Sequence, residues 1–193
     1  MTVTDIATGW TENQSVRNKA QVHVFAAIRR VVQNLPFPIR GIDSDNGSEF
    51  INAQLFRYCH NHDLKFTRSR SGNKNDGAHV EQKNWTAVRQ LVGYLRYDTE
   101  TELLLLNKIW TLQGLIGNHL YPQQKLTSKV RDGAKITKEY DTATTLYAHT
   151  DVTALPKRRL GAKPASFNPA AVQRQIHALA VRWLLTELQR KPL

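Results

Sequence analysis

Cysteine and long apolar runs are both scarce in this chain. Cys59 is the only cysteine among 193 residues, so an internal disulfide is excluded and a reducing compartment, the cytoplasm, is expected. Apolar runs such as Leu103–Leu106 are far shorter than the roughly 20 residues of a membrane-spanning helix. The N-terminus also lacks a basic segment followed by an apolar core. We therefore expect neither a membrane partner nor an export signal.

Negative charge is also in short supply. The chain holds 27 lysine and arginine residues against 16 aspartate and glutamate residues, for a formal net charge of +11. The excess is +3 over residues 1–120 and +8 over residues 121–193, so the C-terminal part carries most of it. Lysine and arginine set against phosphates release condensed counterions, which favours a nucleic acid as partner. A basic run such as Lys157–Arg159 is equally compatible with a solvated linker.

The pattern of apolar residues predicts strands that alternate with helices, hence an α/β fold with a mixed sheet flanked by helices. Pro36 and Pro122 end two of the helical segments because proline cannot continue a helix. The expected elements are a hairpin over 2–16, a helix over 19–34, a strand over 37–43, a helix over 49–61, a strand over 64–67, a polar loop over 69–77, and helices over 78–97 and 99–120. After these we expect a compact core over residues 1–121, a basic extended tail over 122–168 and a C-terminal helix over 169–193.

Two acidic residues stand out by their context and their separation. Asp45 lies in the segment Ile42–Phe50, between an expected strand and an expected helix, and Glu81 lies near the start of the helix over 78–97, with 35 residues between the two. Carboxylates that meet in space are the ligands Mg²⁺ needs to act on a phosphodiester. Taken alone, Asp45 can instead cap the following helix, and Glu81 can complement the dipole of its own helix.

The helical position of Glu81 is unusual for a charged residue. At about 100° per residue, Trp85, Val88 and Val92 share its face, so the carboxylate lies on the apolar stripe and should be partly buried. A buried carboxylate must be compensated by a cation, by a hydrogen-bond network or by exposure at the helix end. A metal ion is one of these three answers.

Together these segments resemble the retroviral integrase and insertion-sequence transposase core. The resemblance rests on Ile42–Phe50 with Asp45, on the 35-residue separation, on Glu81–Trp85 and on Thr4–Trp10, which is similar to the second strand of that family. It implies a ribonuclease-H-like fold, Asp45 and Glu81 as catalytic ligands of Mg²⁺ or Mn²⁺, and transposition or integration by DNA strand transfer. Such cores often pair, so a homo-oligomer is a further expectation.

The resemblance also implies a third acid, which the chain lacks. In the family the first aspartate lies on a strand that precedes the stretch matched here by residues 2–10. Asp5 and Asp43 are the two candidate substitutes. We therefore expect an N-terminally truncated core that lacks the first strand. It is either an enzyme fragment or a catalytically inactive remnant that binds nucleic acid or itself, and a plain metal-dependent nuclease of the same fold is a third reading.

Basic residues cluster in sequence around the two acids. Arg70, Lys74, Lys83 and Arg89 are the candidate nucleic-acid contacts, and their alternative role is a solvated basic face.

The cysteine, histidine and tryptophan residues are given structural roles. Cys59, His60 and His62 lack a second ligand pair at a zinc-finger spacing, so a packed cysteine and surface histidines are favoured. The four tryptophans are expected to pack in the core rather than to stack on bases.

Overall fold

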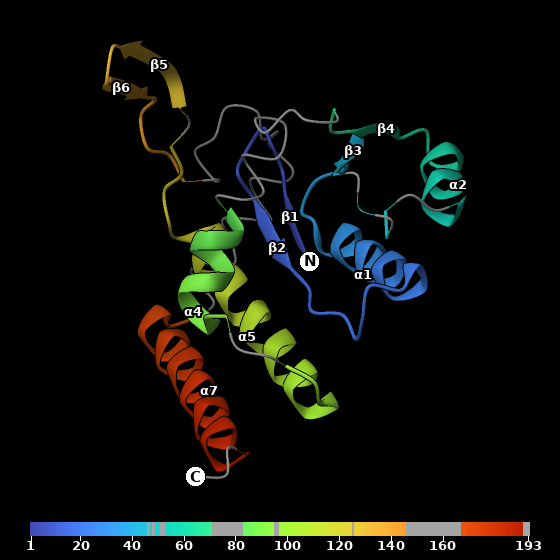
Figure 1. The fold of residues 1–193 in the computed structure, drawn as a ribbon, viewed down its shortest axis with the longest axis vertical. Helices are drawn as coiled ribbons and strands as arrows, with labels where there is room; N and C mark the ends of the chain where they lie inside the picture. Colours follow the sequence, from blue (N-terminus) through green and yellow to red (C-terminus); the bar gives the residue numbers. More distant parts are fainter. Residues whose placement is uncertain are drawn as a thin grey trace.

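The computed structural model describes residues 1–45, 47, 49–50, 53–70, 83–94, 97–124, 126–145 and 167–190, with the backbone alone for 184–190. Figure 1 shows strands β1 and β2 in the middle, helices α1 and α2 on one side with β3 and β4, and helices α5 and α7 on the other. The predicted mixed α/β class is confirmed.

The chain opens with the predicted hairpin. Strands β1 (Thr2–Thr4) and β2 (Thr11–Asn13) pair in antiparallel register. Asp5 closes the turn between them: its Oδ2 accepts hydrogen bonds from the backbone N–H and the hydroxyl of Thr8, at 2.8 and 2.5 Å. This role keeps the Asp5 carboxylate at the turn.

A strand–helix–strand unit follows helix α1 (Gln21–Asn34). It consists of β3 (Gly41–Ser44), α2 (Ala53–Asn61) and β4 (Lys65–Arg68), and the two strands pair in parallel. The segments agree with the helices and strands predicted up to residue 67. Their common core contains Val24 and Ile28 of α1 together with Leu55 and Cys59 of α2.

The second hydrophobic cluster lies between helices α5 (Glu100–His119) and α7 (Pro169–Arg190). Figure 1 shows these two helices side by side. The buried members of this cluster are Val92, Leu106, Ile109, Trp110, Ile116, Val172 and Ile176. The predicted C-terminal helix is therefore present, and its apolar stripe packs against α5.

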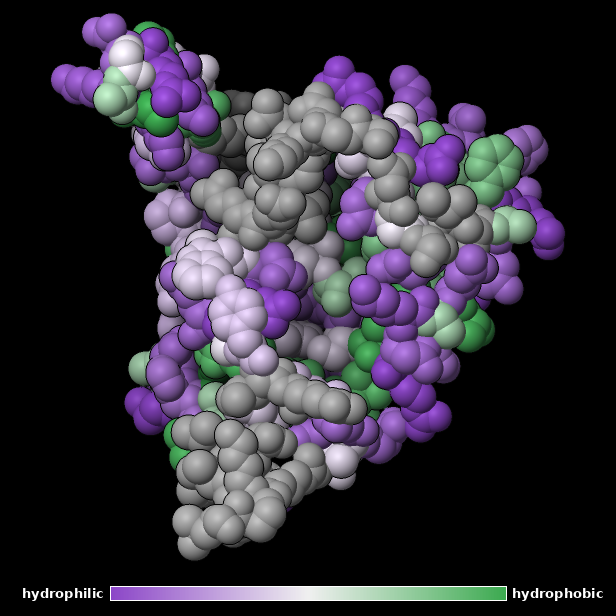
Figure 2. Space-filling view, viewed as in Figure 1, coloured by the Kyte–Doolittle hydropathy of each residue, from purple (hydrophilic) through white to green (hydrophobic). Residues whose placement is uncertain are grey.

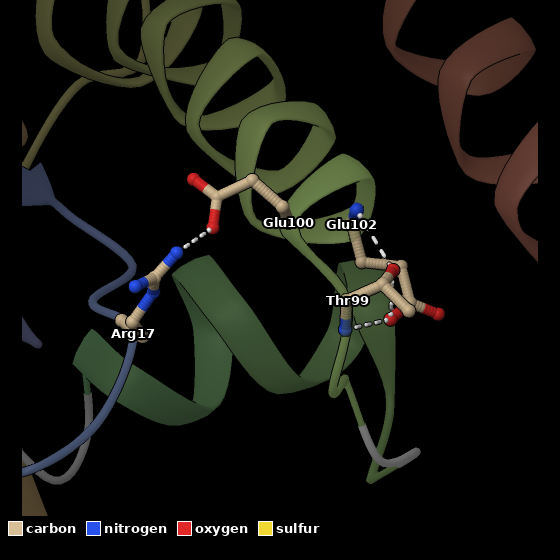
Figure 3. A network of polar contacts seen from close by, with 4 residues as sticks. All are labelled: Arg17, Thr99, Glu100 and Glu102. Carbon is tan, nitrogen blue, oxygen red and sulfur yellow. Dashed lines mark hydrogen bonds and ion pairs between the residues drawn. The ribbon is translucent and has the colours of Figure 1, made fainter.

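Helix α5 begins with a capping box. The Thr99 hydroxyl accepts from the backbone N–H of Glu102 at 3.3 Å, and Oε2 of Glu102 accepts from the Thr99 N–H at 2.8 Å (Figure 3). Near the same helix end Arg17 donates to Glu100 at 2.8 Å, and this ion pair raises the pKa of Arg17. Both partners of the ion pair are exposed, so it contributes little to stability.

Asparagine side chains of α5 hold the free edge of the hairpin. Asn118 is buried, and its amide accepts from the Thr11 N–H at 2.9 Å and donates to the Thr11 carbonyl at 2.8 Å. Eleven positions earlier, Asn107 bonds both backbone groups of Ser15. These amides occupy hydrogen-bonding groups that would otherwise form an unpaired strand edge.

The helix predicted over 78–97 is described from residue 83, and its geometry is unexpected. Residues Trp85–Arg89 form a π-helix, η1, which continues as the short α4 (Gln90–Val92) and ends at Gly93 with φ +67°. A π-turn has more residues per turn than an α-helix, so positions spaced for an α-helical face no longer align.

The tryptophan prediction is wrong for Trp85 for this reason. Its side chain is 51% exposed, whereas Trp10, Trp110 and Trp183 are buried as expected. Val92 is buried, so the expected stripe of Trp85, Val88 and Val92 is split.

The sheet predictions need two corrections. In place of one mixed sheet, the described strands form three separate two-stranded pairs, β1–β2, β3–β4 and β5–β6. The expected extended tail contains a hairpin of β5 (Leu126–Asp132) and β6 (Lys135–Tyr140). The residues of this hairpin alternate only weakly between polar and apolar, so their periodicity does not predict strands. The chain reverses direction at Gly133, which has φ +57°. Among the described helices none is long and apolar enough to cross a bilayer.

Candidate active site around Asp45

Asp45 lies directly after strand β3, beside the end of the parallel strand β4. The side chain is exposed, and its Oδ1 accepts a hydrogen bond from the backbone N–H of Gly47 at 3.0 Å. Loops after parallel strands are where functional side chains of α/β proteins commonly gather. The turn thus fixes one carboxylate oxygen and leaves the side chain accessible to solvent.

A second carboxylate approaches the same turn. A Cβ atom on Gly47 would lie 2.8 Å from Oε2 of Glu49 and 2.9 Å from Oδ1 of Asp45. A side chain at position 47 would push the flexible ends of both acids aside, so glycine leaves room for the two carboxylates at this turn. Sequence reasoning missed Glu49 as a site residue, although its place four residues after Asp45 in the same motif was a usable signal.

Ser44, the residue before Asp45, is the last residue of strand β3 and is buried. Its hydroxyl oxygen is buried and has no hydrogen-bond partner, while its backbone carbonyl accepts from the Ser69 N–H at 2.9 Å. A buried hydroxyl without a partner among the described residues is uncommon, and its burial separates it from the exposed carboxylate of Asp45.

Asp5 and Asp43, the two candidates for a further catalytic acid, both accept hydrogen bonds from nearby threonines. Asp5 accepts from Thr8 in the first turn. Asp43 is exposed on β3, and its Oδ1 accepts from the Thr67 hydroxyl of β4 at 2.5 Å. Each carboxylate has a local structural role in its own pair of strands.

Two of the predicted site residues lie outside the described part of the chain. They are Glu81 and Lys74, so the distance from Asp45 to Glu81 stays a prediction. Within the described ranges, no group of three or more histidine, cysteine, aspartate or glutamate residues is arranged to hold a metal ion.

The three remaining basic candidates have different surroundings. Arg70 is exposed. Arg89 is half-buried, with its guanidinium carbon 4.6 Å from the ring centroid of Tyr94 and a 3.3 Å hydrogen bond to the Gly93 carbonyl. Lys83 is half-buried and donates to Oε1 of Gln123. Burial lowers the pKa of the Lys83 ammonium, because water solvates its charge less well there.

Lys83 lines a cavity of about 290 Å³ between η1, α5, α7 and the first hairpin. Asparagine and glutamine side chains supply polar groups to its lining, among them Gln113, whose buried Oε1 has no hydrogen-bond partner among the described residues. Gln123 is held in place by paired backbone bonds to Thr144 and a side-chain bond to the Tyr121 carbonyl. Lys83 is therefore held at this cavity by a Gln123 side chain that is itself fixed, and no residue of the Asp45 turn is among the described residues that line the cavity.

Cys59 is buried and packs with α1, as predicted, and burial raises the pKa of its thiol. His60 and His62 are exposed, also as predicted, and the His62 ring lies 4.4 Å from that of Tyr58. A buried thiol with a raised pKa is a poor metal ligand and a poor nucleophile.

No family model matches the chain. The uncharacterized protein y4rM of Sinorhizobium fredii is 43% identical over 140 residues, which are 72% of this chain and 40% of that protein. The chain therefore spans less than half the length of this curated relative.

A solved structure with a related arrangement is the catalytic core domain of BIV integrase in crystal form I. It is similar with a TM-score of 0.42 and 17% sequence identity, over 76% of this chain and 80% of that chain. A likeness of this size does not define what the chain does.

Proposed function

We propose that the chain is part of a metal-dependent enzyme of DNA integration or transposition, with Asp45 and Glu81 as metal-binding catalytic residues. One observation carries the proposal: an exposed carboxylate, Asp45, stands at the end of a parallel strand, and a second acid, Glu49, approaches the same glycine turn. The 35-residue separation from Glu81 supports it at the level of sequence.

The donors around Asp45 suit a hard divalent cation. Asp45 and Glu49 bring carboxylate oxygens to this turn, and residues 44–50 contain no cysteine or histidine. Mg²⁺ and Mn²⁺ prefer such oxygen ligands. Asp45 would hold the ion, and Glu81 would complete the site.

The ion would supply Lewis-acid stabilisation of the charge that develops on a phosphodiester. Gly47 fixes Asp45 through its N–H, so the carboxylate has little rotational freedom to lose when it binds the ion. The Asp43–Thr67 hydrogen bond ties β3 to β4 and thereby fixes the strand end that carries Asp45. The net charge of +11 favours a polyanionic substrate.

A plasmid-nicking assay tests the proposal. In Mg²⁺ or Mn²⁺, we expect Asp45→Asn and Glu81→Gln each to lower the nicking rate by about 100-fold or more, since several kcal/mol of metal-dependent stabilisation would be lost. Asp132→Asn, an exposed acid of the β5–β6 hairpin, is the matched control and should retain the wild-type rate. Equal rates for wild type and Glu81→Gln would remove Glu81 from the mechanism.

The second candidate function is a nucleic-acid-binding protein without catalysis. The observation that favours it is the local engagement of Asp5 and Asp43, which leaves no third acid beside Asp45 and Glu49 among the described residues. Titration with Mn²⁺ separates the two functions. Tight Mn²⁺ binding that is lost in Asp45→Asn supports the enzyme. DNA binding without Mn²⁺ binding and without nicking supports the second candidate.

A further inference from the structure

The β5–β6 hairpin is a two-stranded ribbon that projects from the rest of the molecule (Figure 1). All residues from 129 to 140 are exposed, and Figure 2 shows the ribbon at the upper left with hydrophilic side chains interspersed with hydrophobic ones. A two-stranded hairpin without a covering layer is only marginally stable in water. A bound partner would therefore stabilise the ribbon.

The pairing register sorts the charges onto two different faces. Lys129 lies opposite Lys138, and Arg131 lies opposite Ile136. Residues two apart on a strand share a face, so these three cations lie on one face. The other face carries Asp132, Lys135 and Glu139, and is therefore slightly acidic.

The Lys129–Lys138 pair is unfavourable in the isolated chain. Like charges directly opposite each other across two strands repel. Within the part of the chain that the structure describes, neither lysine forms an ion pair. An external anion between the two ammonium groups would relieve the repulsion.

We propose that the Lys129, Arg131 and Lys138 face of the β5–β6 ribbon binds the phosphate backbone of duplex DNA. The major groove of B-DNA admits a two-stranded β-ribbon, and the three cations would then lie against the flanking phosphates. Ile136, 45% exposed on the same face, would lie toward the groove. The proposal rests on the DNA substrate of the proposed function but does not require metal chemistry at Asp45.

An acidic protein is the competing partner for the same cations. DNA is favoured because its charges are regularly spaced along an extended backbone, which matches a row of cations on an extended ribbon better than a folded acidic surface does. The C-terminal excess of positive charge, +8 over residues 121–193, points in the same direction.

The test measures binding of a fluorescent DNA duplex by anisotropy over a range of salt concentrations. In Lys129→Gln/Lys138→Gln, we expect weaker binding and a salt slope reduced in magnitude by about 2, because two phosphate contacts are lost. The matched control is Lys108→Gln/Lys135→Gln. It removes the same charge from exposed positions, one on α5 and one on the acidic face of the ribbon, and should leave the slope nearly unchanged.

A second readout excludes loss of folding as the cause. Removing the like-charged pair should slow amide hydrogen exchange in the hairpin when no DNA is present, while DNA affinity falls. Equal salt slopes for the two double variants would overturn the proposal. So would a wild-type chain that shows no salt-dependent binding to the duplex.

The failure of this proposal is distinguishable from that of the proposed function. In EDTA, where no metal-dependent nicking occurs, the wild type should still bind the duplex, and Lys129→Gln/Lys138→Gln should still show the reduced salt slope. If the wild type nicks DNA and Lys129→Gln/Lys138→Gln binds the duplex as tightly as the wild type, the proposed enzymatic function stands and the proposed ribbon interface fails.

Discussion

Lys83 is a half-buried cation, and no acidic side chain is among the described residues that line its cavity. Its ammonium donates to the Gln123 amide, and Lys83 and Tyr121 are the titratable side chains among the residues that line the cavity. Because burial lowers the pKa of Lys83, the folded chain disfavours the protonated form relative to the unfolded chain. The free energy of unfolding therefore depends on pH through the protonation of Lys83.

The sign of that dependence gives a prediction at the scale of one residue. The relevant pH range lies between the lowered pKa of Lys83 in the folded chain and its pKa of about 10.4 in the unfolded chain. In this range the unfolded state binds more protons than the folded state, so the stability of the wild type rises with pH. Below the lowered pKa the penalty is fully present. We expect the stability of Lys83→Met, relative to wild type, to be highest near neutral pH and to decline as pH rises through this window.

Urea unfolding at several pH values measures this difference, with Lys108→Met as the control for the loss of one exposed positive charge. A difference between Lys83→Met and wild type that grows with pH would contradict the burial of Lys83.

At the scale of elements, helix α5 shows how local sequence signals specify a helix end. Glu102 is buried, and its Oε2 accepts from the Asp98 N–H, the Thr99 N–H and the Thr99 hydroxyl at 2.9, 2.8 and 2.7 Å. These bonds satisfy donors that the helix itself leaves unpaired. The sequence Thr99–Glu102 alone carries this information, so this helix start was predictable.

Removing the cap should therefore destabilise the chain. We expect Thr99→Ala to lower the free energy of unfolding by about 1 to 2 kcal/mol, because the Glu102 N–H and carboxylate both lose a partner. Thr101→Ala, an exposed position in the same turn, should be neutral or slightly stabilising since alanine is the better helix former. Denaturant titrations compare the two, and equal losses would contradict the capping role.

Helix η1 shows the limit of such local signals. The spacing of Trp85, Val88 and Val92 predicts one apolar face, yet the π-turn exposes Trp85 and leaves it 6.4 Å from the ring of Tyr94. A π-turn is an unfavourable local geometry that the surrounding structure must impose. No periodicity rule identifies it from sequence.

At the scale of the whole molecule, α7 and α5 form one hydrophobic unit although about fifty residues separate them in sequence. Ile176 is 2% exposed within their shared cluster, and the Trp183 ring stacks on that of Tyr97 at 4.7 Å between centroids. The helix that is most distant in sequence therefore completes the core around α5.

This docking predicts a large effect of one distant side chain. We expect Ile176→Ala to cost about 2 to 5 kcal/mol, through lost burial and the cavity left against α5. Val181→Ala, which is 54% exposed on the same helix, should change stability by less than about 0.5 kcal/mol. Thermal and chemical unfolding measure both variants, and a negligible effect of Ile176→Ala would mean that α7 does not pack on α5 in solution.

The sequence by itself determined the helices α1, α2 and α5, the first hairpin, and the position of Asp45 between a strand and a helix. Each depends on interactions within a few residues: Pro36 after α1, the capping box at Thr99, and the glycine turn at Gly47. Local sterics and hydrogen bonds fix such features before any tertiary contact forms.

Only the tertiary structure decided how these segments meet. Four features depend on contacts that the spacing of residues in the sequence does not predict. They are the approach of Glu49 to Asp45, the half-buried position of Lys83, the π-turn at Trp85 and the charged face of the β5–β6 ribbon. Their free energies come from burial and from pairing register between distant segments, which periodicity within one segment does not encode.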